Sequence, residues 1–124
     1  MFTRVHYRYT DAGNYKFWAS VILDGEMSAE DREIVARTLD SGACDGHGFI
    51  PQQLGWPHPA EDRLDFPCSD DHCFSELPVD EDGIFEIVSV PLHGEVVRDY
   101  VSGWVGNMQR IAGNGGWDVE RWAI

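Results

Sequence analysis

The sequence predicts an α+β domain, with a largely antiparallel sheet of four to five strands and two helices packed on one of its faces. Three observations support this fold class: two-residue alternation near the N-terminus, two segments with apolar residues at three-and-four spacing, and glycine or proline between segments. The 124 residues fit a single domain, 1–124, which is long enough to bury a modest core. A long acidic, proline-rich loop is expected between the two halves.

The N-terminal segment is predicted to form a β-hairpin. Residues 2–9 alternate between an apolar or aromatic face and a basic face, which is the period of a strand. A turn rich in Asp, Gly and Asn follows, and residues 15–23 are rich in aromatic and β-branched side chains. If Arg4 and Arg8 share the exposed face with Lys16, the hairpin carries the one cationic patch of the protein.

Two helices are predicted from apolar stripes. Ser28 with Asp31 three residues later resembles a capping box, so a helix is expected over residues 29–40. Its apolar stripe is narrow. A second helix is predicted over residues 95–111, where Val, Tyr, Trp, Met and Ile recur at three-and-four spacing. The glycine-rich run 113–116 is interpreted as the end of this helix and a turn.

Three further strands are predicted. Residues 48–51 form a short one, and residues 84–90 form a strong one that is apolar on nearly both faces, which is typical of a central strand. Residues 117–122 alternate and are expected to be a final edge strand. Prolines between residues 51 and 67 make regular structure improbable there.

Negative charge is concentrated in the middle of the chain. Of 22 acidic side chains, ten lie in residues 61–86, where Arg63 is the only basic residue. A net charge of −13 repels nucleic acid and anionic membranes, and it accelerates encounter with a cationic partner. The sequence therefore predicts no direct binding of nucleic acid and no membrane association. The alternative that the carboxylates only keep the protein soluble stays open.

Apolar side chains are interleaved with these carboxylates. Aromatic anchors supply contact area at a binding surface, while surrounding charges supply steering and specificity. Equally, the same apolar side chains can fasten the loop to the core. The residues predicted to contact a partner are Asp65, Phe66, Asp70, Asp71, Phe74, Glu76, Asp80, Glu81 and Asp82.

A loose zinc-ligand pattern accompanies the acidic loop. Cys44 and His47 form one short pair, and Cys68 and Cys73 form a second, with His72 as a substitute for Cys73. Thiolate and imidazole ligands from two loops could close a tetrahedral structural site. The three cysteines are an odd number, which argues for reduced thiols or a metal site over a disulfide framework. Three unpaired cysteines without a metal are the alternative.

Catalytic signals are weak. Asp71 and His72 resemble a general-base pair or part of a divalent-metal site, but sequence proximity alone carries little weight. No nucleophile elbow or cysteine-protease signature surrounds Ser69, Ser75 or the cysteines. The protein is therefore expected not to be an enzyme.

These observations favour a small acidic binding protein that occupies a basic, nucleic-acid-binding surface of a partner protein. By analogy of composition, immunity proteins and phage anti-defence inhibitors of CRISPR (anti-CRISPR) or restriction complexes act in this way. The alternative is a small zinc-stabilised domain with a structural or enzymatic role, and no other cofactor is expected. With no signal peptide or membrane span in the sequence, a cytoplasmic location is predicted.

Overall fold

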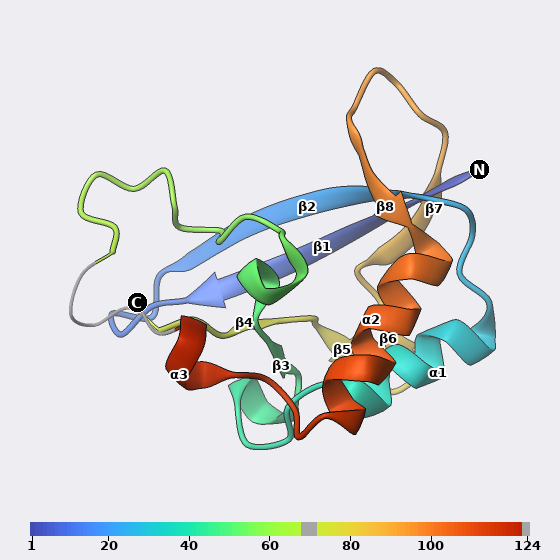
Figure 1. The fold of residues 1–124 in the computed structure, drawn as a ribbon. Helices are drawn as coiled ribbons and strands as arrows, with labels where there is room; N and C mark the ends of the chain where they lie inside the picture. Colours follow the sequence, from blue (N-terminus) through green and yellow to red (C-terminus); the bar gives the residue numbers. More distant parts are fainter. Residues whose placement is uncertain (68–71, 123–124) are drawn as a thin grey trace.

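A long antiparallel hairpin forms the centre of the fold (Figure 1). In this computed structural model, which describes residues 1–67 and 72–122, β1 (Phe2–Thr10) pairs with β2 (Lys16–Asp24) along the full length of both strands. Alternate residues of β1 are buried, as the two-residue period of a strand requires when one face packs on a core. The predicted hairpin is confirmed.

Short strands extend the sheet on both sides of the hairpin. β7 (Ile87–Val90) and β4 (Ser75–Glu76) pair antiparallel with β1, and β3 (Gly48–Phe49) pairs with β4. On the other side, β8 (Val97–Tyr100) runs parallel to the end of β2. β5 (Val79–Asp80) and β6 (Gly83–Ile84) form a separate two-stranded ribbon. The main sheet has six strands, one or two more than predicted, because several are only two to four residues long.

The two main helices pack against each other on one face of the hairpin (Figure 1). α1 (Ala29–Thr38) begins at the predicted capping box: Asp31 N–H donates to Ser28 Oγ at 3.0 Å, and Ser28 N–H donates to Asp31 Oδ2 at 3.1 Å. α2 (Val101–Gly113) buries an apolar stripe that includes Trp104 and Met108. The mixed α+β architecture, with a mostly antiparallel sheet, is therefore confirmed.

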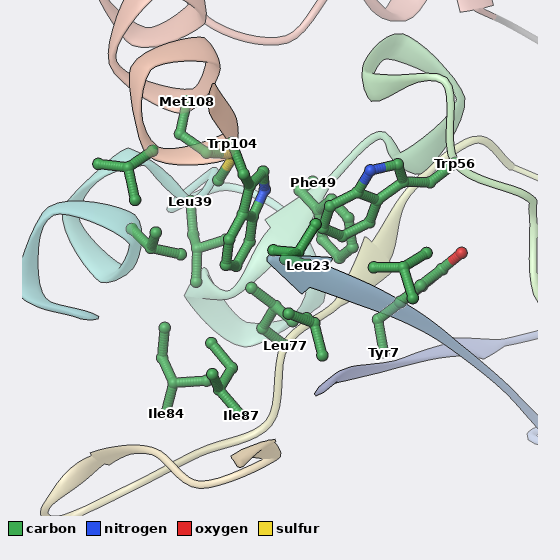
Figure 2. Packing of buried hydrophobic residues seen from close by; sticks show 14 of the residues in the cluster. Tyr7, Leu23, Leu39, Phe49, Trp56, Leu77, Ile84, Ile87, Trp104 and Met108 are labelled. Carbon is green, nitrogen blue, oxygen red and sulfur yellow. The ribbon is translucent and has the colours of Figure 1, made fainter. Parts of the chain in front are cut away.

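Aromatic side chains fill the space between the sheet and the helices (Figure 2). The rings of Trp56 and Trp104 lie 5.2 Å apart between centroids, and those of Trp56 and Tyr7 lie 5.6 Å apart. Trp56 and Leu77 come from the proline-rich and acidic segments of the sequence, and both are buried. Each large apolar side chain so buried contributes about 1.5–3 kcal/mol, so these two residues fasten their segments to the core.

The C-terminal segment differs from its prediction. Residues 119–122 form a short helix, α3 (Val119–Trp122), so the predicted edge strand over 117–122 is wrong. Asp118 Oδ1 accepts a hydrogen bond from Arg121 N–H at 3.1 Å, which satisfies a free N–H of the first helical turn. The buried Trp117 donates its indole N–H to Thr38 O at 3.3 Å and fixes the chain before that turn.

Two other boundaries are corrected. The predicted helix over residues 95–111 begins only at Val101, because Val97–Tyr100 forms β8 beside β2. The predicted strand over 84–90 is divided into β6 and β7 with a bend at residue 86, and β7 is not central: Val88 is 41% exposed. Within the described residues, no helix is long and apolar enough to cross a bilayer.

Candidate partner-binding surface

A tight turn between β5 and β6 presents three consecutive carboxylates to solvent. Val79 pairs with Ile84 and Asp80 with Gly83, which leaves Glu81 and Asp82 at the tip. Gly83 has φ of 111°, a conformation that L residues rarely adopt. Asp80 Oδ1 accepts a hydrogen bond from Asp82 N–H at 2.9 Å and stabilises the turn from within. We refer to Asp80, Glu81 and Asp82 as the acidic turn.

A groove of about 360 Å³ separates the acidic turn from α1. Ala29, Ala36 and Ile84 are its apolar lining residues. Its charged lining is Glu33 of α1, Glu81 and Asp82 of the turn, and Arg32. The groove therefore combines an apolar surface with an excess of carboxylate.

Arg32 holds the two sides of this groove together. Its guanidinium donates to Ile84 O at 2.8 Å and to Ile87 O at 2.5 Å, both backbone acceptors on the strands beside α1. The carboxylates of Glu33, Glu81 and Asp82 form no ion pair with any residue in 1–67 or 72–122. Arg32 donates to backbone carbonyl groups, so within the described residues it forms no ion pair with these carboxylates.

Glu33, which lines the groove, and the exposed Phe85 were not among the residues predicted to contact a partner. Glu33 belongs to α1, far in sequence from the acidic stretch 61–86. Its predicted outward position on the helix was the signal that could have marked it as a surface residue. Phe85 follows Ile84 directly and is 47% exposed, whereas the sequence predicted a continuous buried strand there. Aromatic residues are enriched at protein interfaces.

The basic face of the hairpin does not remain free. Arg4 pairs with Glu95 and Arg8 pairs with Glu76, the latter at 2.5 Å between Nε and Oε1. The Glu76 side chain is only 14% exposed. Glu76 was predicted to contact a partner, but the structure places its carboxylate in an internal ion pair across the sheet, away from the acidic turn.

The predicted partner contacts Asp65, Phe66 and Phe74 are also engaged within the chain. Asp65 Oδ1 lies 2.6 Å from Arg63 Nε, although the Asp65 side chain is 71% exposed. Phe66 is half-buried with its ring 4.7 Å from that of His58, and Phe74 packs against the core. Asp70 and Asp71 lie outside the described residues.

His58 fastens the loop that carries these residues. It is 1% exposed, with its ring 4.4 Å from that of Tyr9 in an edge-on arrangement. Its Nδ1 accepts from Ala60 N–H at 3.1 Å, and its Nε2 lies 3.2 Å from His72 O. One buried imidazole thus joins two stretches of the loop to β1.

The two described cysteines that were predicted as zinc ligands, Cys44 and Cys73, have raised thiol pKa values. Burial, with help from the Glu76 and Asp45 carboxylates, raises the pKa of the Cys44 thiol to about 11. Burial also raises the pKa of Cys73. Across 1–67 and 72–122, no group of three or more His, Cys, Asp or Glu side chains could hold a metal ion. Cys68 lies outside the described residues, so the zinc site with His47 stays a prediction.

Of the remaining catalytic candidates, the structure describes His72 and Ser75. The His72 ring lies against that of Tyr9 at a tilt of 52°, with ring centroids 4.7 Å apart, and its Nε2 lies 3.2 Å from Thr10 O. Its predicted partner Asp71 lies outside the described residues. Ser75 is fully buried in β4, where a substrate cannot reach its hydroxyl group.

Comparison of the chain with protein-family models, with curated proteins and with solved structures found no match. Any function must therefore be argued from the site itself.

Proposed function

We propose that the protein is a non-enzymatic binding protein that uses the acidic turn and its groove to occupy a basic surface of a partner protein. The observation that carries this proposal is that the groove carboxylates are not neutralised by ion pairs. Glu33, Glu81 and Asp82 gather on one groove without an ion pair to any described residue. Carboxylates that only aid solubility need no shared apolar groove.

The groove suits a long cationic side chain. Lys and Arg carry an aliphatic stem that packs on apolar surface, while the charged head stays polar. Ala36 and Ile84 would contact the stem, and Glu33, Glu81 and Asp82 would surround the head. Phe85 beside the turn would add apolar contact area.

Basic protein surfaces commonly serve to hold nucleic-acid phosphates. A protein of net charge −13 that covers such a surface competes with the phosphate backbone and acts as an inhibitor. Support for the inhibitor class, including the anti-CRISPR, anti-restriction and immunity types, comes from charge and shape alone. The mechanism would be steric and electrostatic and would require no cofactor.

The test compares two variants with the same change in net charge. One replaces three groove carboxylates: Glu33→Gln, Glu81→Gln and Asp82→Asn. Its matched control replaces three exposed carboxylates elsewhere: Asp24→Asn, Asp45→Asn and Glu120→Gln. Both proteins and the native form are used to capture partners from a bacterial lysate, and affinity for each purified partner is then measured at low and moderate salt.

The groove variant is expected to bind the partner at least about tenfold more weakly, because close charge pairs each contribute about 1.5 kcal/mol or more. The control should bind like the native protein, and added salt should weaken native binding. The purified partner should also release a labelled DNA or RNA duplex when the native protein is added. Equal losses in both variants, or no loss in either, would overturn the proposal.

A further inference from the structure

The outer edge of β2 is only partly covered. β8 pairs with Ile22, Leu23 and Asp24, and no other strand of the described chain lies beside residues 16–21 on that side. Figure 1 shows this edge of β2 running clear of the other strands before β8 reaches it. An open strand edge presents unpaired backbone N–H and C=O groups.

The register identifies which backbone groups face outward. His6 N–H donates to Glu86 O on the β7 side of β1, so the even-numbered residues of β1 point away from β2. The odd-numbered residues, such as Tyr7, therefore face β2, where Tyr7 is opposite Ala19. It follows that the odd residues of β2 bond to β1, and the N–H and C=O groups of residues 16, 18 and 20 point outward.

The side chains at this edge offer little protection against pairing. Lys16, Trp18 and Ser20 are exposed, and Trp18 retains 47% of its surface. The Arg8 guanidinium lies 5.3 Å from the centre of the Trp18 ring. Natural edges are blocked by proline, by bulges or by several charges. Here the register shift of β2 lies beyond the open part, between Ile22 and Leu23, and Lys16 supplies a single charge.

The charged side chains near the open edge of β2 indicate which kind of partner can pair with it. Arg4 and Arg8 are balanced by Glu95 and Glu76, whereas Lys16 at the open edge has no ion pair within the described residues. A cationic protein is attracted to the acidic turn instead, whereas residues 16–20 contain no carboxylate that would repel a second copy of this chain, whose net charge is −13. The spacing also suits a two-fold axis at Trp18, because Lys16 then faces Ser20 of the other copy and no like charges are opposed.

We propose that two copies of the chain associate through antiparallel pairing of their β2 edges about a two-fold axis at Trp18. Pairs 16–20, 18–18 and 20–16 would form about six backbone hydrogen bonds and join the two sheets into one. The two Trp18 rings would lie opposite each other across the axis, where aromatic cross-strand pairs are favourable. This inference is independent of the acidic turn.

Sedimentation equilibrium over a wide concentration range tests the proposal, at about 0.05 M and about 0.5 M salt, between which screening increases strongly. The native protein should reach twice the mass of the chain, and more readily at high salt, because salt screens the repulsion between two acidic copies. Binding of a basic partner has the opposite salt dependence, so the two surfaces are distinguished.

Two variants and two controls locate the contact. Trp18→Glu places two carboxylates at the axis, and Ser20→Pro removes an outward N–H without breaking a bond to β1. Each should weaken dimerisation at least tenfold, while Ser20→Ala and Trp18→Phe should dimerise like the native protein. Circular dichroism verifies that each variant is folded. Amide hydrogen exchange of residues 18 and 20 in the native protein, which should slow as concentration rises, needs no variant.

A native protein that stays monomeric throughout this range overturns the proposal. So does a dimer that both folded variants leave intact, or one that forms without slowing exchange at residues 18 and 20.

Discussion

The acidic segment of the chain divides into two parts that behave differently. In residues 57–67 and 72–77, Asp65 and Glu76 pair with Arg63 and Arg8, and His58 fastens the backbone to β1. In residues 79–86, the carboxylates of the acidic turn have no such partner within the described residues. Asp65 and Glu76 in the first part are therefore used for internal attachment, whereas the carboxylates of the acidic turn are not.

The difference shows that a count of carboxylates does not locate a binding surface. The binding surface depends instead on which carboxylates the fold places next to an arginine side chain. β1 contributes Arg8, which reaches β4 but not the β5–β6 ribbon. Arg32, which lines the groove beside the acidic turn, donates to backbone carbonyls instead. The negative charge of the acidic turn is therefore not neutralised by Arg32, because the guanidinium donates to backbone carbonyls.

The largest loss of stability is expected when residues 57–67 and 72–77 lose their contact with β1 through His58. His58→Ala removes a buried ring and leaves the Ala60 N–H without its acceptor, which should cost about 3 kcal/mol of unfolding free energy. Urea unfolding monitored by circular dichroism measures this. As a control, His6→Ala on the outer face of β1 should change the unfolding free energy by no more than about 0.5 kcal/mol. Similar values for both would contradict the anchoring role of His58.

A smaller loss of stability should distinguish a carboxylate in an ion pair from one without a partner. Glu76→Ala leaves Arg8 without its partner in a partly buried setting and should lower the unfolding free energy by about 2 kcal/mol. Glu81→Ala should leave it unchanged within about 0.5 kcal/mol, because an exposed residue in an acidic cluster loses no partner. If Glu81→Ala destabilised the protein as much as Glu76→Ala, the distinction between attached and available charge would be lost.

The smallest effect is a change in thiol ionisation next to Glu76. The pKa of Cys44 is raised from 9.0 to about 11, so stability should fall as the pH rises from 9 towards 11, where only the unfolded thiol has ionised. In Glu76→Gln the pKa should move back towards 9, because a raising carboxylate is removed and the nearby Arg8 remains.

Thiol reactivity measured against pH tests this shift, in a background that carries Cys68→Ser and Cys73→Ala so that Cys44 alone reacts. Asp118→Asn, which lies in the α3 cap, serves as the control and should leave the reactivity profile as it is. An unaltered profile in Glu76→Gln would show that the Glu76 carboxylate does not raise the pKa of Cys44.

Local patterns predicted the elements whose determinants lie close together in sequence. The alternation in residues 2–9 and the capping box at Ser28 each depend on residues a few positions apart, and both elements form where expected. Residues 97–100 continue the apolar spacing of the helix that follows, but they form β8 because β2, some 75 residues earlier, offers an edge. No local pattern carries that information.

The C-terminal error has a different cause. Alternation of residues 117–122 indicated a strand, whereas Asp118 at the N-cap position was a competing signal for the helix that forms. For the candidate surface, the acidic turn was predicted from charge, while Glu33 joins it only because α1 packs beside β6. The Arg8–Glu76 pair, 68 positions apart in sequence, was equally hidden.

The uneven exposure of the tryptophans gives the protein its own optical reporter. Trp56, Trp104 and Trp117 are buried, whereas Trp18 on the open edge of β2 is 47% exposed. A collisional quencher in solution therefore meets Trp18 far more readily than these three indoles. Any strand that settles against this edge should shield Trp18 and reduce the quenched fraction of the emission, so occupancy of β2 can be followed without a label.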